Sequence, residues 1–121
     1  MSISFQVEQR TRYAVVRVDG EPALEEFLDF IAQIGAQSQA WPTPRLLVDL
    51  RSIRSLKSFT EHYAIGGAVA RHMAHLNQVA SVVPADRITR ASEKTAQKAG
   101  VNLAVFTSEG GAIAWLTGAA A

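Results

Sequence analysis

The stretch Leu46-Leu47-Val48-Asp49-Leu50 is a short and almost continuous apolar run. Strands that are buried on both faces have this pattern, because neither side of such a strand meets water. The segment before it, Trp41-Pro42-Thr43-Pro44, contains two prolines, which a helix interior does not tolerate. The sequence therefore predicts a central β-strand that follows directly on a helix-breaking loop.

The residues upstream of this strand predict a β-hairpin followed by a helix. Apolar and polar side chains alternate over residues 3–8, and after a polar link at 9–11 a second run covers 13–18 and ends at Asp19-Gly20. Pro22 suits the first turn of a helix, where its missing N–H has no partner to lose. The helix would extend to about Gln37, since apolar side chains recur at helical spacing at Leu24, Phe27, Leu28, Ile31 and Ile34.

The residues downstream predict two further helix–strand units and a short terminal helix. Ser58 and Glu61 have the spacing of a capping box and open a second helix. Its apolar stripe consists of Phe59, Val69, Met73 and Leu76. A strand is expected over 79–83 and a helix over 87–99, with Asp86 as its N-cap and Gly100 at its end. A last strand over 101–106 precedes a helix that starts at Ser108 and packs through Ile113, Trp115 and Leu116.

These elements predict an α/β fold in one domain over residues 1–121. We expect a mostly parallel five-stranded sheet with an N-terminal β-hairpin and four helices, connected by right-handed crossovers. A chain of 121 residues can close such a core without disulfides or metals.

Composition excludes several classes of function. The formal net charge is +1 and the chain has no cysteine, so a nucleic-acid coat, a thiolate zinc site and a cysteine nucleophile are not expected. No apolar run approaches the roughly 18 residues of a membrane span, and no leader pattern precedes the first strand. We therefore expect a cytoplasmic protein without integral membrane association.

The loops that follow the strands carry no familiar catalytic motif. Ligands of open α/β sheets bind at the carboxyl ends of the strands, but the chain has no Gly-x-Ser-x-Gly, P-loop or Gly-x-Gly-x-x-Gly motif. Asp19 and Asp49 could form an acid/base or metal pair, although an Asp that ends a strand more often stabilises a turn. His62, His72 and His75 all fall on the second helix; His72 and His75 have the spacing for two ligands on one face, but they do not converge with His62. We expect no enzyme activity, no cofactor and no metal.

Basic side chains gather at two places. Arg51, Arg54 and Lys57 follow the buried strand at the predicted ligand end, where they could contact an anion or a partner. A second group on the third helix could meet phosphate or an acidic surface, or could be an ordinary solvated face; it contains Arg87, Arg90, Lys94 and Lys98. The second helix also has a small-residue face that could pack against another subunit of a homodimer; it contains Ala64, Gly67, Ala68 and Ala74.

The run 46–53, a serine at the next helix start and the ending around residues 105–116 resemble the SpoIIAA-like, STAS/SEC14-type proteins. The resemblance implies a β-α superhelical fold shared with anti-sigma-factor antagonists and lipid-binding CRAL-TRIO domains, neither of which is an enzyme. In the antagonists, a serine at the start of the helix after the central strand is phosphorylated by a partner kinase. Ser58 is the positional match, with Lys57 before it where the family has Asp and Phe59 after it where a small residue is usual.

Two binding functions and one enzymatic function follow as hypotheses. The first is a non-catalytic protein-interaction or regulatory module, whose partner docks on Arg51, Arg54, Lys57 and Ser58. The alternative is a carrier or sensor that binds a small apolar or amphipathic ligand between the second helix and the sheet, with a pocket at Phe59, His62, Tyr63 and Met73. The third is an enzyme that uses His62 with Asp19 or Asp49, which requires these side chains to converge.

Overall fold

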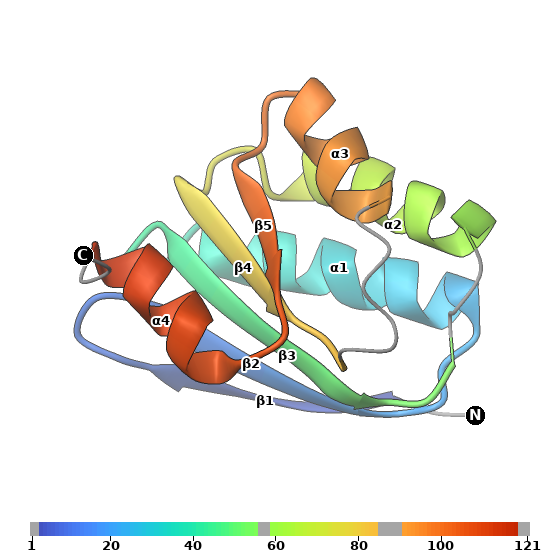
Figure 1. The fold of residues 1–121 in the computed structure, drawn as a ribbon, viewed down its shortest axis with the longest axis horizontal. Helices are drawn as coiled ribbons and strands as arrows, with labels where there is room; N and C mark the ends of the chain where they lie inside the picture. Colours follow the sequence, from blue (N-terminus) through green and yellow to red (C-terminus); the bar gives the residue numbers. More distant parts are fainter. Residues whose placement is uncertain (1–2, 56–58, 85–90, 119–121) are drawn as a thin grey trace.

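The fold is a five-stranded mixed sheet in which the strands follow one another in chain order (Figure 1). The computed structural model describes residues 3–55, 59–84 and 91–118. Strands β1 (Ile3–Gln9) and β2 (Ala14–Gly20) form the predicted antiparallel hairpin. Strands β3 (Arg45–Ile53), β4 (Gln78–Val82) and β5 (Leu103–Phe106) then add in parallel, so the order across the sheet is β1-β2-β3-β4-β5.

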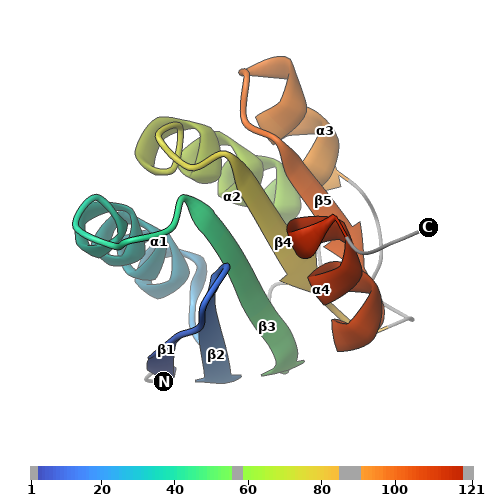
Figure 2. The same cartoon turned by 90° about the vertical axis from the view of Figure 1, so that its left-hand side faces the viewer.

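The helices lie on both faces of the sheet. Helices α1 (Leu24–Ser38), α2 (Phe59–His72) and α3 (Ala91–Lys98) each connect two parallel strands and share one face, as expected when successive crossovers have the same hand (Figure 2). Helix α4 (Glu109–Thr117) follows the last strand and packs on the opposite face against β3, β4 and β5. The α/β class and the N-terminal hairpin are therefore confirmed.

The helix boundaries agree with the sequence-based predictions at the start of α4 and differ from them at the end of α2. Ser108 is the N-cap of α4, as predicted, and its Oγ accepts a hydrogen bond from the N–H of Gly111 at 3.1 Å. Helix α2 ends at His72, so Met73 and Leu76, predicted to lie on its apolar stripe, belong instead to the turn that leads into β4. The predicted N-cap Asp86 and the capping-box residue Ser58 lie outside the described residues.

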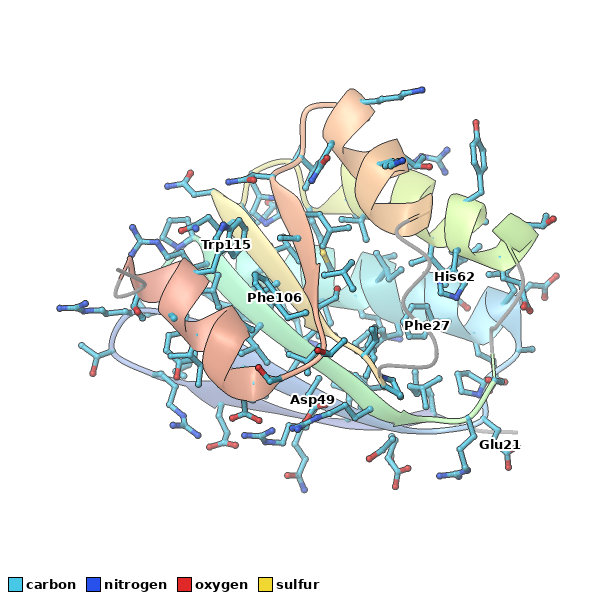
Figure 3. All side chains as sticks on the ribbon, in the orientation of Figure 1. Glu21, Phe27, Asp49, His62, Phe106 and Trp115 are labelled. Atoms are coloured by element: carbon cyan, nitrogen blue, oxygen red, sulfur yellow. The ribbon has the colours of Figure 1, made fainter. Side chains whose placement is uncertain are left out.

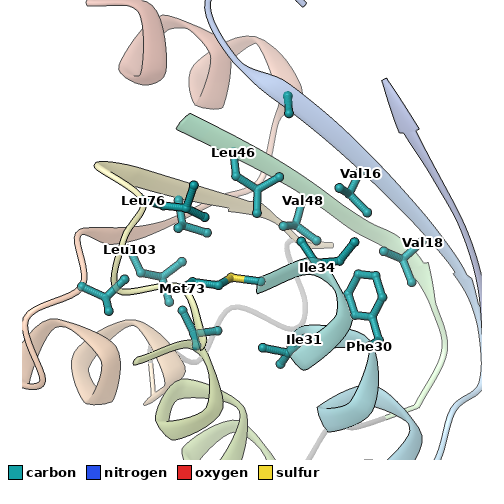
Figure 4. Packing of buried hydrophobic residues seen from close by; sticks show 14 of the residues in the cluster. Val16, Val18, Phe30, Ile31, Ile34, Leu46, Val48, Met73, Leu76 and Leu103 are labelled. Carbon is teal, nitrogen blue, oxygen red and sulfur yellow. The ribbon is translucent and has the colours of Figure 1, made fainter. Parts of the chain in front are cut away.

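Alternating side chains of the strands build two hydrophobic clusters, one on each face of the sheet. Leu46 and Val48 of β3 pack toward α1 and α2 together with Ile34 and Met73 (Figure 4). Leu47, between them in sequence, packs on the other face under α4. All five of these side chains are buried, which explains why the run that contains β3 is apolar on both sides.

Helix α4 does not cover the whole of its face. The side of β1 and β2 beyond it carries polar side chains, and Ser4, Gln6, Glu8 and Asp19 are exposed there while Arg17 is half-buried. We call this uncovered side of β1 and β2 the open face. It is bounded by the first turn of α4, so any charged group at that turn meets the polar side chains of the sheet.

Candidate interaction surface

Four charged side chains close a ring at the boundary between the open face and α4. Arg17 of β2 contacts Asp49 of β3 at 2.9 Å and holds Glu109 of α4 through two bonds of 2.9 and 3.1 Å. Arg51 of β3 also contacts both acids, with bonds of 2.8 and 2.9 Å to Asp49 and of 2.9 Å to Glu109. We call these four residues the charged ring. Figure 3 shows Asp49 near the first turn of α4, where the ring lies.

An irregularity in β3 makes this arrangement possible. Arg17 of β2 is opposite Asp49, but Asp19 is opposite Ser52, so β3 has one extra residue between the two pairs. Such a bulge takes one backbone N–H out of the regular ladder and re-aims the side chains next to it. Asp49 Oδ1 accepts a hydrogen bond from the N–H of Arg51 at 3.1 Å. The Asp49 carboxylate thus stabilises both the bulge and the ring.

All four groups of the ring are held in their charged forms. The hydrogen bonds from Arg51 are the largest cause that lowers the pKa of Asp49, and those from Arg17 do the same for the pKa of Glu109. Glu109 and Asp49 in turn raise the pKa values of Arg17 and Arg51. No group of the ring is therefore shifted toward the neutral range that general acid–base catalysis requires. The ring joins β2, β3 and α4 and presents two charges of each sign.

A second group of charges lies at the ends of β2 and β3. Arg54 is 57% exposed and contacts Asp19 at 3.3 Å and Glu21 at 3.7 Å. The N–H of Arg54 donates to the carbonyl of Gly20, and the Ser55 hydroxyl donates to the carbonyl of Pro22 at 2.7 Å. Arg54 and Ser55, the residues directly after β3, are thus hydrogen-bonded to the segment between β2 and α1.

A shallow hollow of about 340 Å³ lies between the two groups of charges. Most of the described residues in its lining have polar or charged side chains, and they include Arg17 and Asp49 from the ring and Asp19 from the second group. β1 contributes Ser4 and Gln6 to the same hollow. The result is a polar, exposed surface at the carboxyl end of β2 and β3.

The sequence predicted some of this surface but not its acidic half. Arg51 and Arg54, which were predicted to contact a partner, lie on this surface, and each is paired with carboxylates of the same chain. Lys57 and Ser58 lie outside the described residues. Glu109 was missed, although its place directly after the N-cap Ser108 at a predicted ligand end was a usable signal. Asp49 was considered for an acid/base or metal pair and instead binds two arginines.

The residues predicted for an apolar pocket do not come together. Tyr63 is 60% exposed, whereas Met73 is 2% exposed and packs in the core. His62 is half-buried on α2. With a helix rise of about 1.5 Å per residue, it lies roughly 16 Å from Met73 along the direction of the helix axis. Of Phe59 the structure describes the backbone, as the first residue of α2. The structure therefore does not place Tyr63 and Met73 in one pocket, and the carrier hypothesis gains no support.

The hypothesis of an enzyme that uses His62 with Asp19 or Asp49 is not consistent with the fold. His62 belongs to α2, on one face of the sheet, while Asp49 faces α4 on the other (Figure 3). Asp19 is engaged with Arg54 at the edge of the open face. The catalytic hypothesis required these side chains to converge, and the sheet separates them.

One serine–histidine contact lies elsewhere in the molecule. Ser38 Oγ is 2.7 Å from Nε2 of His75, beside a hollow of about 520 Å³ at the amino-terminal end of β3. The same hydroxyl bonds the carbonyl of Gly35 at 3.0 Å, and Ser38 is 4% exposed. Bonding back to the preceding helical turn is ordinary for a serine in a helix. Since the only proton of this buried hydroxyl can serve the Gly35 carbonyl, we interpret the contact as a structural link between α1 and the turn before β4.

Among residues 3–55, 59–84 and 91–118, no three His, Asp or Glu side chains gather as a metal site would require. No helix within the same ranges has the length and apolar character of a membrane span.

Comparison with known proteins identifies the fold. A sequence model described as SpoIIAA-like matches residues 13–117, which includes β2 and everything after it up to the end of α4. The chain belongs to the SpoIIAA-like family. No curated protein matches it significantly.

Solved structures agree with the family assignment. An anti-sigma factor antagonist from Mycobacterium paratuberculosis aligns with a TM-score of 0.65 at 18% identity, covering 96% of this chain and 95% of the other. The anti-sigma factor antagonist SpoIIAA in its unphosphorylated form aligns with a TM-score of 0.61 at 17% identity, covering 95% and 97%. An uncharacterized protein with a SpoIIAA-like fold from Shewanella loihica has a TM-score of 0.62 at 15% identity, covering 95% and 93%. At these identities the alignments establish the fold.

Proposed function

We propose that this SpoIIAA-like chain is a non-catalytic, regulatory protein-interaction module that works as one domain in the cytoplasm. The observation that carries the proposal is the near-complete alignment with two anti-sigma factor antagonists, proteins whose name describes opposition to another protein. The pairing of charges in the ring agrees with it, since none of these groups is shifted toward a catalytic pKa.

We infer that the partner docks at the carboxyl end of β3 and the start of α2. Arg54 precedes the segment 56–58 and Tyr63 follows it, and both side chains are more than half exposed. Tyrosine and arginine are enriched among the residues that dominate binding energy at protein interfaces. The surface also includes Arg51, Lys57 and Ser58.

The experiment uses the partner captured with the full-length chain and then purified, with affinities measured by calorimetry. Arg54→Glu places a third carboxylate beside Asp19 and Glu21, so we expect affinity to fall about tenfold or more, which is ~1.4 kcal/mol. Arg12→Glu is the matched control, because this exposed arginine lies in the hairpin link at the other end of the sheet. Equal effects of the two reversals, or none from Arg54→Glu, would contradict the proposed surface.

Ser58 is tested separately as a regulatory position. Phosphate at this site would add negative charge at the start of α2 and could repel a docked partner. We expect Ser58→Asp to weaken binding of the purified partner while Ser58→Ala leaves it unchanged. If both variants bind as the wild type does, the hypothesis of a phosphorylation switch is wrong. The interaction surface around Arg54 is tested independently by the affinity of the Arg54→Glu variant.

A further inference from the structure

Strand β1 ends the sheet and is paired on one side alone within the described residues. It forms a continuous antiparallel ladder with β2 from Ile3↔Gly20 to Gln9↔Ala14, without a bulge. In the order β1-β2-β3-β4-β5 its other side faces no strand. Edge strands of this kind can pair with another chain unless the sequence prevents it.

The hydrogen bonds of the hairpin show which backbone groups point to the free side. The N–H of Arg10 donates to the carbonyl of Tyr13 at 2.9 Å, which makes this a hydrogen-bonded pair of the ladder. Because such pairs alternate along antiparallel strands, the even-numbered residues of β1 point their N–H and C=O groups toward β2. The N–H and C=O groups of Ile3, Phe5, Val7 and Gln9 therefore point to the free edge.

The side chains of this strand give the edge little protection, since Glu8 is its one charged residue. The sequence Ile-Ser-Phe-Gln-Val-Glu-Gln contains no lysine, arginine or proline, which are common means of blocking edge pairing. Ile3, Phe5 and Val7 pack against the core beside α1 but remain partly exposed. The ring of Phe5 lies 5.0 Å from that of Phe30 of α1. The rim of the hydrophobic core is thus open to water along β1.

We propose that β1 is a dimerisation strand that pairs antiparallel with β1 of a second copy of this chain, around a two-fold axis at Gln6. Only registers that place odd-numbered residues opposite odd-numbered ones match the outward backbone groups. With Gln6 at the axis, Phe5 is opposite Val7 of the second copy and Ile3 is opposite its Gln9. The four odd-numbered positions would form about eight backbone hydrogen bonds, two for each pair.

The side chains favour a second copy of the same strand in this register. Phe5 and Val7 form apolar cross-strand pairs on the α1 face, which covers the open rim of the core. Glu8 is opposite Ser4 of the second copy, so no like charges meet. Such an interface is self-complementary and closes after two subunits, whereas an in-register parallel pairing would place the two Glu8 carboxylates side by side. The open face and the end of β3 remain available in the dimer.

Sedimentation of the full-length chain over a range of concentrations tests the proposal. We expect a reversible dimer for the wild type and a folded monomer for Val7→Pro. Proline at this position removes an N–H that points to the free edge and leaves the ladder with β2 intact. Val7→Thr is the matched control, since it keeps the N–H and the β-branched shape, and it should remain dimeric.

Charge at the axis gives a second test that does not depend on proline. Two copies of residue 6 face each other as a non-hydrogen-bonded pair, with Cα atoms about 4.5 Å apart. Gln6→Glu and Gln6→Lys should therefore each weaken the homodimer at least tenfold, and an equimolar mixture of the two variants should associate again. Circular dichroism melts verify that each variant is folded.

The outcomes separate this proposal from its competitors. A wild-type chain that stays monomeric up to about 1 mM overturns it, even if the edge takes up a strand of a different protein. A dimer that is indifferent to Val7→Pro and to both changes at Gln6 also overturns it and would point to another surface, such as the small residues of α2. Neither result affects the docking surface around Arg54, which is tested by its own variants.

Discussion

Gly35 of α1 allows the closest approach between α1 and α2, and its replacement by alanine tests how these helices pack. A Cβ atom at this position would lie 2.4 Å from the carbonyl oxygen and 2.8 Å from Cβ of His72. Ordinary van der Waals contact begins near 3.4 Å, so α1 and α2 would have to separate by about 1 Å. The clashing atoms include backbone, which cannot move away as a flexible side chain can.

The magnitude follows from two opposing terms. Overpacking a well-packed site costs about 1–3 kcal/mol, while alanine gains about 1 kcal/mol over glycine in helix propensity. We expect Gly35→Ala to lower the free energy of unfolding by about 0–2 kcal/mol. Gly67 of α2 provides the matched control, because a Cβ at that position meets nothing within 4 Å. Gly67→Ala should raise the free energy of unfolding by about 0.5–1 kcal/mol.

Urea unfolding followed by circular dichroism measures both variants against the wild type. The two substitutions have the same chemistry and both lie in helix interiors, so the difference between their unfolding free energies isolates the contact with His72. Because the gain in helix propensity is common to both variants, we expect that difference to equal the overpacking cost, about 1–3 kcal/mol, which linear extrapolation can measure. If Gly35→Ala is as stabilising as Gly67→Ala, the close contact between α1 and α2 does not exist in solution.

Three further predictions concern the ring, the cap and the core under α4. Asp49→Asn should lower the free energy of unfolding by about 1–2 kcal/mol at pH 7. The lowered pKa values of Asp49 and Glu109 contribute stability that is present above about pH 4 and is lost as pH falls through the folded-state values, so the difference measured by urea unfolding should be smaller at about pH 2.5 than at pH 7. Ser108→Ala should cost about 0.5–2 kcal/mol by the same measurement, and Ser108→Asp, which can still cap, much less. Leu116→Ala, at a side chain 1% exposed, should cost about 2–5 kcal/mol in thermal unfolding.

The parts of the fold that the sequence predicted are those encoded by local periodicity. The β1–β2 hairpin and the buried strand β3 have side-chain patterns of period two or an unbroken apolar run, and each forms where it was expected. The cap Ser108 succeeded for the same reason, because its partner Gly111 is three residues away. Each of these patterns involves residues that are close in sequence, so it can be recognised without knowing which distant segments are in contact.

The charged ring could not be predicted in the same way. Arg17 and Glu109 are 92 residues apart in sequence and meet only because α4 folds back over the sheet beside β2 and β3. The bulge in β3 also decides which side chains reach the ring, and bulges depend on pairing with a neighbouring strand. Pairing between Asp49 and Arg51, two residues apart on one strand, was visible in sequence as a same-face pair of opposite charge.

The apolar stripe predicted for the second helix extends past the end of α2. Val69, Met73 and Leu76 are all buried, so these residues of the predicted stripe do belong to the hydrophobic core. Helix α2 nevertheless stops at His72, and Met73 continues the last turn only through its N–H bond to the carbonyl of Val69. Met73 is buried in the core while Tyr63 is 60% exposed, so the structure gives no support to one pocket that contains both side chains.

The pairing of every arginine at the docking surface constrains what a partner can be. Arg51 shares Asp49 and Glu109 with Arg17, and Arg54 lies between Asp19 and Glu21, so an incoming phosphate or carboxylate would have to displace carboxylates already in contact. A partner gains more by matching the alternating charges in place, since complementary potentials at a rim add specificity without breaking existing pairs. The same reasoning applies to a phosphate on Ser58, which would compete with Asp19 and Glu21 for Arg54. We therefore expect such a phosphate to act by repelling the partner and not by forming a new ion pair within the chain.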